Sequence, residues 1–264
     1  MDLDYTHYSI LLSVALSLGM MLCLEIGRRI GKRHLKRDPA GALVGIGPIE
    51  NAVFALLGLM VAFTFFGAAS RFDARRHLIV EETNAIGTAF LRVDLLPSAV
   101  QPPLRELFKR YLDTRLEFYR KLPDMDAAKL QLSAAQKIQG EIWRHSVSTS
   151  RQQEAHVDAA KLLLPALNEM IDITTTRTMA MEMHPPVIIF ILLIGLALTS
   201  SLLAGYPMAE SKTHNWLHLL GFSLVMAVSV YVILDLEFPR LGLIRVDSFD
   251  QALVQLRESM NETK

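Results

Sequence analysis

The feature that most constrains this chain is a proline-free stretch at residues 49–96. Residues 52–70 are apolar and uncharged, and about 20 such residues are enough to cross a bilayer as a helix. Residues 71–96 are amphipathic and charged but keep helix-forming residues. No proline interrupts the join, so we predict one helix that starts in the membrane and continues outside it as a stalk, about 70 Å long.

Three further apolar runs predict three more membrane spans. They are residues 9–24, residues 187–206 after Pro185 and Pro186, and residues 216–236, with Trp216 and Tyr231 near the two membrane interfaces. The first run is also compatible with a signal peptide. However, its basic residues follow the apolar run rather than precede it, and no small-residue cleavage site appears. We therefore expect the first span to be retained.

The polar stretch between the second and third spans predicts a separate helical domain. Helical spacing of apolar residues indicates helices at about 104–122, 127–146 and 152–183, the last with a bend at Pro165. No segment alternates with period two, so the fold class is all-α, with the extramembrane domain continuous with span two. The predicted regions are residues 1–70 with spans one and two, 71–184 with the domain, 185–236 with spans three and four, and 237–264 with a short amphipathic tail helix.

The orientation in the membrane has two competing interpretations. Residues 28–37 carry six Lys or Arg, and the positive-inside rule places this short loop in the cytoplasm. With four spans, the central domain then lies on the extracytoplasmic side. The arginines near span ends on the domain side compete with this assignment: Arg71, Arg75, Arg76, Arg240 and Arg245.

Composition excludes several classes of function. The chain has 27 Lys+Arg and 27 Asp+Glu, so no net positive field recruits nucleic acid. Its only cysteine, Cys23, lies in an apolar run, which excludes a disulfide or a thiolate metal site within one chain. His214 and His218 have zinc-binding spacing, but only Glu210 lies near to complete a ligand set. We predict no metal, no cofactor, no catalytic residue and no enzyme activity.

Two segments resemble the bacterial bestrophin-like family of four-span membrane proteins. They are LLGLMVAFTFFGAASRFDARRHLIVEETNAIGTAFLRVDLLP and LDLEFPRLGLIRV. Within the first, Phe63, Ala68, Arg71 and Arg76 are similar to the second-span signature of bestrophin anion channels. The resemblance implies a homo-oligomer in the bacterial inner membrane, a pentameric pore and conduction of chloride or other small anions. Likeness to true bestrophins also implies a cytoplasmic domain, against the charge argument.

Span two carries the candidate pore residues. Ala55, Gly58 and Ala62 share one face, and small faces let helices approach closely in lipid. Such a face is compatible with packing inside one subunit. It is also compatible with copies of span two around a pore, where large apolar side chains form a constriction. The candidate pore-lining or gate residues are Phe54, Gly58, Phe63, Phe65 and Phe66.

Charged residues gather just beyond the membrane ends of spans two and four. The set consists of Arg71, Asp73, Arg75, Arg76, Asp235 and Glu237. A solvated stalk face with i,i+4 pairs is one explanation, and an anion-attracting vestibule is another. Acids at a membrane boundary need a partner, so we expect Asp235 and Glu237 to form ion pairs with span-two arginines.

Two classes of function therefore stay open. One is an oligomeric anion channel, and the other is a non-conducting scaffold or sensor that acts through the helical domain. Both have the lipid bilayer and further copies of the chain as partners. Between residues 53 and 66, only Gly58 and Thr64 are residues expected to suit a water-filled pore. This sparse supply favours a scaffold or a closed hydrophobic gate.

Overall fold

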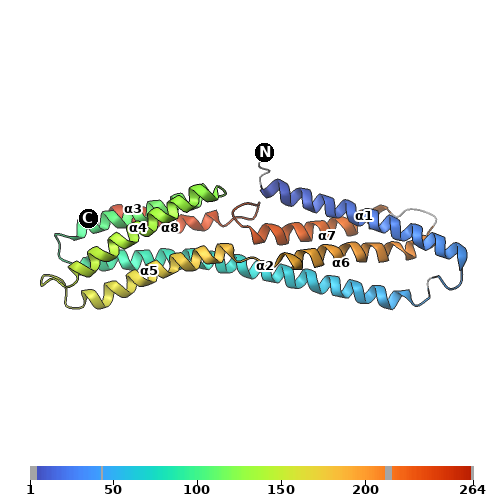
Figure 1. Ribbon diagram of the computed structural model, residues 1–264, viewed down its shortest axis with the longest axis horizontal. Helices are drawn as coiled ribbons and strands as arrows, with labels where there is room; N and C mark the ends of the chain where they lie inside the picture. Colours follow the sequence, from blue (N-terminus) through green and yellow to red (C-terminus); the bar gives the residue numbers. More distant parts are fainter. Residues whose placement is uncertain (1–4, 43, 212–215, 263–264) are drawn as a thin grey trace. The chain divides into compact units, whose positions relative to one another are not determined.

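The computed structural model describes residues 5–42, 44–211 and 216–262, and all regular elements in these ranges are helices (Figure 1). Four segments are long and apolar enough to cross a membrane. Their membrane helices are α1 (Tyr5–Arg37), α2 (Ile46–Leu91), α6 (Val187–Gly205) and α7 (Trp216–Glu237). The predicted all-α fold with four transmembrane helices is therefore confirmed.

Helix α2 is continuous through Gly67, as the absence of proline predicts, and a 3₁₀ turn, η1 (Arg92–Leu95), follows it. The chain forms two compact units, and α2 contributes to both. The membrane unit consists of Met1–Phe72 and His184–Ile244, and the helical domain consists of Asp73–Met183 and Arg245–Lys264. The tail is thus shared: residues 237–244 belong to the membrane unit and residues 245–264 to the domain.

In the membrane unit, α1 packs against α6 and α7 and against the short η2 (Pro207–Glu210) that follows α6. Glycines allow the closest approach. A Cβ atom at Gly205 would overlap the Leu24 carbonyl oxygen, and one at Gly27 would overlap that of Leu202. Helices in lipid associate by close packing rather than by the hydrophobic effect, so these glycines fix the α1–α6 pair.

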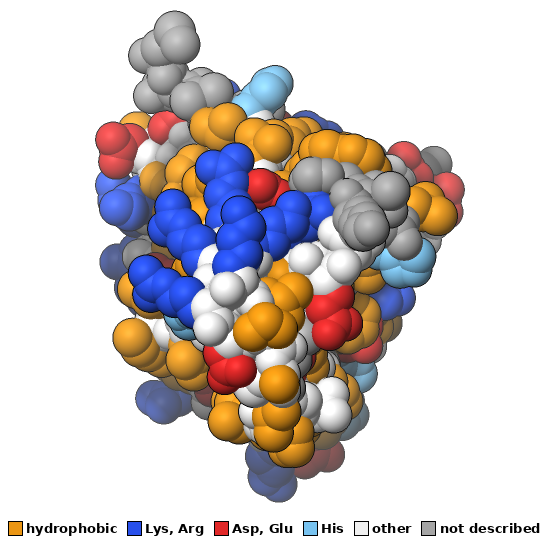
Figure 2. Space-filling model, turned by 90° about the vertical axis from the view of Figure 1, so that its right-hand side faces the viewer, with side chains coloured by type: hydrophobic (Ala, Val, Ile, Leu, Met, Phe, Trp, Pro, Cys, Tyr) orange, Lys and Arg blue, Asp and Glu red, His pale blue; other side chains and the backbone are white. Residues whose placement is uncertain are grey.

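The basic segment at residues 28–37 is helical, which corrects its prediction as a loop. Helix α1 continues to Arg37, because charged residues do not stop a helix and Pro39 is the first breaker. Arg28 is buried and donates from Nη2 to the Ser211 carbonyl at 3.0 Å. Figure 2 shows Lys and Arg side chains gathered at this end of the membrane unit. The exposed ones on α1 are Arg29, Lys32, Arg33, Lys36 and Arg37.

The helical domain packs the second half of α2 with α3 (Gln101–Lys121), α4 (Met125–Thr149), α5 (Ala159–Glu182), η3 (Asp247–Asp250) and α8 (Gln251–Glu262). Its core includes Phe90, Phe108, Leu112, Ile142 and Leu167, all less than 4% exposed. Asp124 caps α4, because its Oδ1 accepts from the Ala127 amide at 3.0 Å. Leu253 of α8 is buried in the same core.

The predicted start of the last domain helix is wrong. Helix α5 begins at Ala159, and residues 151–158 form turns instead. In these turns the His156 amide donates to the Leu95 carbonyl at 2.9 Å, a tertiary contact that competes with helix formation. Helix α5 then continues through Pro165.

Candidate functional site

The membrane half of α2 leaves most of its surface uncovered within the chain. Between residues 52 and 70, only Leu57 and Ala68 are buried. Ala55, Gly58 and Ala62 are exposed on the opposite side, and their i, i+3, i+7 spacing places them in one line along the helix. We call these three residues the small stripe. A Cβ atom at Gly58 would meet no atom within 4 Å, so nothing in the described chain requires glycine there.

The structure separates the four candidate phenylalanines. Phe65 and Phe66 continue the line of the small stripe, three and four residues after Ala62, and are 46% and 72% exposed. Phe63 is 64% exposed but borders a pocket on another side of α2. Phe54 is half-buried, and its ring meets Phe222 edge-on at 6.0 Å between centroids. Only Phe65 and Phe66 therefore share the face of Gly58.

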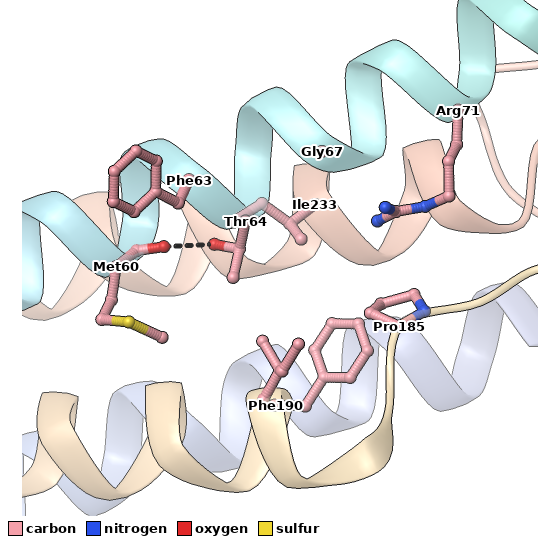
Figure 3. Close-up of a pocket in the computed structure, with 9 residues that line it drawn as sticks. Met60, Phe63, Thr64, Gly67, Arg71, Pro185, Phe190 and Ile233 are labelled. Carbon is pink, nitrogen blue, oxygen red and sulfur yellow. Dashed lines mark hydrogen bonds between the residues drawn. The ribbon is translucent and has the colours of Figure 1, made fainter.

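A pocket of about 190 Å³ lies between α2, α6 and α7 (Figure 3). Its lining is mainly apolar, and the Thr64 hydroxyl donates to the Met60 carbonyl of the same helix at 2.7 Å. Among the described residues that line the pocket, Arg71 is the only charged one. The full set is Met60, Phe63, Thr64, Gly67, Arg71, Pro185, Ile189, Phe190 and Ile233.

Arg71 makes the expected ion pair with Glu237, whose side chain is fully buried at the end of α7. The Arg71 Nη2 lies 2.7 Å from the Glu237 Oε2, and Nε lies 3.0 Å from both carboxylate oxygens. His184 Nδ1 lies 3.1 Å from the Glu237 Oε1, and the His184 ring stacks on Phe238 at 4.4 Å. A buried carboxylate with a bidentate arginine is well satisfied, so the pair holds α2 to α7.

The expected ion pair between Asp235 and an arginine of span two is wrong. Among the described residues Asp235 pairs with no arginine and instead accepts backbone N–H groups. The Leu243 amide donates to Oδ1 at 2.9 Å, and the Ile244 amide donates to Oδ2 at 2.6 Å. A buried carboxylate can be satisfied by amide dipoles as well as by a cation. Asp235 thus folds the segment after α7 back onto the end of that helix.

The other two arginines make contacts inside the helical domain. Arg75 is buried and donates to the Ala180 carbonyl at 3.0 Å and the Met183 carbonyl at 2.8 Å, at the end of α5. Arg76 pairs with Asp73 at 3.0 Å, and its guanidinium lies 4.2 Å from the centre of the Phe249 ring. Structural contacts thus account for both side chains, and an anion vestibule stays a prediction.

The domain core holds a charge network that the sequence did not predict. Glu82 of α2, Arg115 of α3 and Arg177 of α5 are all buried. Arg115 Nε lies 2.6 Å from the Glu82 Oε1, Arg177 pairs with the Glu82 Oε2, and Arg177 Nη2 also reaches the Asp250 Oδ1 at 3.0 Å. Burial by itself would raise the pKa of Glu82, but the two arginines lower it to about 2.

A neutral network lies beside this cluster. The Tyr111 hydroxyl lies 2.8 Å from the Thr174 Oγ1, and the Gln139 Nε2 donates to both at 3.0 Å. Burial and the Glu82 charge raise the pKa of Tyr111 to about 12, so this phenol is neutral at physiological pH. Together the two networks connect α2, α3, α4, α5 and η3 through polar contacts.

Metal ligands do not cluster in the part of the chain that the structure describes, where no group of three or more His, Cys, Asp or Glu could hold an ion. His214, one member of the weighed histidine pair, lies outside the described residues.

These features define a class: a four-span, all-helical membrane protein with a helical extramembrane domain. Comparison with known protein families then matches residues 14–248 to the Bestrophin-like domain. The chain belongs to the bestrophin-like family, as the two sequence segments predicted. No curated protein and no solved structure matches it.

Proposed function

We propose that the protein forms an oligomeric anion channel in which the small stripe of α2 lines the pore. The observation that carries the proposal is the exposure of Ala55, Gly58 and Ala62 on a face that no other part of the described chain covers. A helix surface that contacts only lipid gains nothing from a line of small side chains, whereas a surface that meets another helix or a narrow pore does. Membership in the bestrophin-like family supports the same assignment.

In such an assembly, copies of α2 surround a central axis. Phe65 and Phe66 follow the small stripe and narrow the pore until water leaves it, which stops ions that must keep their hydration. Asn51 and Ser70, both exposed, give the two ends of the stripe polar side chains. Chloride is the expected permeant ion and a pentamer the expected assembly, as family resemblance implies.

The test is to substitute Gly58 and Gly195 separately by Leu. Both glycines are exposed in helices, and a Cβ atom at either would meet no atom of the chain within 4 Å. We expect Gly58→Leu to lower the oligomer fraction and the chloride flux from liposomes severalfold, because it fills the small stripe. Gly195→Leu is the matched control on α6 and leaves both unchanged. Equal behaviour of the two variants would contradict a role for the stripe.

A second candidate is a non-conducting scaffold or sensor that acts through the helical domain. One observation favours it: the exposed face of α2 carries no polar side chain between residues 52 and 69. Thr64, the only polar side chain of this range, lies on the pocket side of α2 and donates its hydroxyl to carbonyls of its own helix. Intact oligomers without chloride flux in any variant would favour the scaffold.

We also propose that the basic end of α1 faces the cytoplasm and the helical domain the extracytoplasmic side of a bacterial inner membrane. Single cysteines at Lys36 and Asp126, in a chain with Cys23 replaced, test this. Both positions are exposed, so accessibility of the side chain within the chain does not limit labelling. An impermeant maleimide applied to intact cells should label position 126 and not position 36. The reverse pattern would place the domain in the cytoplasm.

A further inference from the structure

We propose that the pocket between α2, α6 and α7 binds one anionic phospholipid, with an acyl chain in the pocket and the phosphate on Arg71. The inference is independent of conduction, since a channel and a scaffold could both hold such a lipid. It rests on three properties of the pocket: its apolar lining, its position within the membrane unit, and an arginine with N–H groups to spare.

The lining favours an acyl chain over water. A buried water needs two to four polar partners, and most residues around this pocket offer none. Thr64 is already satisfied by the carbonyls of Met60 and Val61. Along α2 the lining extends from Met60 to Arg71, about 16 Å of helix, which suits an extended chain. Phe63 borders the pocket and is 64% exposed, so this side meets the surrounding lipid.

Arg71 supplies the site for the headgroup. Its Nε and Nη2 bond Glu237, whereas Nη1 makes no hydrogen bond within the described residues. Figure 3 shows the guanidinium directed into the space between α2 and α6, towards Gly67 and above Pro185. A Cβ atom at Gly67 would lie 3.3 Å from Nη1, so glycine at this position makes room for the guanidinium.

A phosphate suits these free N–H groups. Arginine presents five donors in a fixed fork and binds phosphate through charge-assisted hydrogen bonds. Glu237 neutralises part of the arginine charge, so binding combines hydrogen bonds to Nη1 with the residual attraction between the guanidinium and an anionic headgroup. Arg71 follows directly on the uncharged run 52–70, the depth at which lipid phosphates lie. The bilayer supplies phospholipid at high local concentration, which favours it over a soluble anion.

The test places a fluorescent reporter in the pocket. In a chain whose Trp143 and Trp216 are replaced by Phe, Phe190→Trp sets one tryptophan against the pocket. Ile191→Trp, one residue further and exposed on the same helix, is the matched control for ordinary boundary lipid. The protein is reconstituted with phosphatidylglycerol or phosphatidylcholine that carries bromine on its acyl chains. Quenching by phosphatidylglycerol at position 190 should be at least about threefold stronger than by phosphatidylcholine. Both lipids offer a phosphate to Arg71, but the quaternary ammonium of phosphatidylcholine cancels the headgroup charge and is repelled by the guanidinium.

Two further variants separate the binding site from a general effect on folding. Gly67→Ala moves the guanidinium and should remove the preference at position 190 while the ion pair persists. The double variant Arg71→Gln with Glu237→Gln removes both charges together, which avoids an unpaired buried carboxylate. It should also remove the preference for the anionic lipid at position 190. Equal quenching by the two lipids at position 190, or the same preference at position 191, would overturn the proposal. Stronger quenching by a brominated fatty acid than by phosphatidylglycerol would overturn the phospholipid assignment.

Discussion

Chloride flux from liposomes should rise at least about tenfold when Phe66 is replaced by Ala, since each 1.4 kcal/mol or so removed from a barrier gives a factor of ten. Phe66 is the most exposed phenylalanine of α2 and continues the small stripe. If this face lines a pore, its ring keeps the constriction dry, and a methyl group in its place admits water. Because the ring makes few contacts within the chain, its removal should leave the subunit folded.

Phe63→Ala is the matched control for this prediction. Phe63 is 64% exposed, close to the 72% of Phe66, but it borders the pocket instead of the stripe. We expect its flux to equal that of the unmodified protein. Phe65→Ala should give a smaller rise than Phe66→Ala, since Phe65 is less exposed. No increase at either position 65 or 66, in correctly assembled protein, would exclude a gate of these rings and leave the scaffold.

Replacement of Glu82 by Ala should destabilise the helical domain by about 3–5 kcal/mol. The substitution leaves Arg115 and Arg177 buried without their shared carboxylate, and an uncompensated buried charge is costly. Glu81→Ala is the matched control, because Glu81 is exposed and pairs with the exposed His77, so its effect should stay within about 0.5 kcal/mol. Hydrogen exchange of α3 and α5 in the full-length protein measures the difference. Equal protection in the two variants would show that the network does not stabilise the domain.

The same network predicts loss of stability in acid. The pKa of Glu82 is about 2 in the folded protein and 4.5 for the free carboxyl group. A lowered folded-state pKa stabilises the fold above the unfolded value, so this contribution is complete above pH 4.5 and disappears as pH falls towards 2. Its size is about 3 kcal/mol. Hydrogen exchange at several pH values should show the decline, and the Glu82→Ala variant should lack this component.

Features that depend on local composition could be predicted from the sequence, whereas features that depend on contacts between distant residues could not. Uncharged runs locate spans because lipid imposes a length and an apolar composition. The predicted loop at residues 28–37 is wrong because a high density of Lys and Arg is compatible with a helix, and the first proline after this segment is Pro39. The start of α5 was missed because His156 bonds Leu95, a contact between residues distant in sequence.

The candidate site likewise contains contacts that the sequence predicts and contacts that it does not. Arg71 and Glu237 were expected to pair because both end a span, whereas Asp235, two residues earlier, binds amides that only the folded turn presents. The Glu82 network was missed although a signal existed. Arg115 lies on the apolar face of α3, three residues after Leu112 and four after Tyr111. A charged residue on such a face needs a buried partner, but the sequence does not say which one.

The packing of α1 against α6 and α7 has a consequence for insertion into the membrane. Helix α1 ends at Arg37 and its first partner, α6, begins at Val187, so residues 38–186 must be synthesised before the two helices can meet. At about 5–20 residues per second, this interval is roughly 7–30 s. During it the face that Leu24 and Gly27 will turn to α6 stays in contact with lipid. The Ser13 hydroxyl, on the side that becomes buried, already donates to the Ser9 carbonyl of its own helix at 2.9 Å. This local hydrogen bond keeps the Ser13 hydroxyl satisfied while that face of α1 lies in lipid.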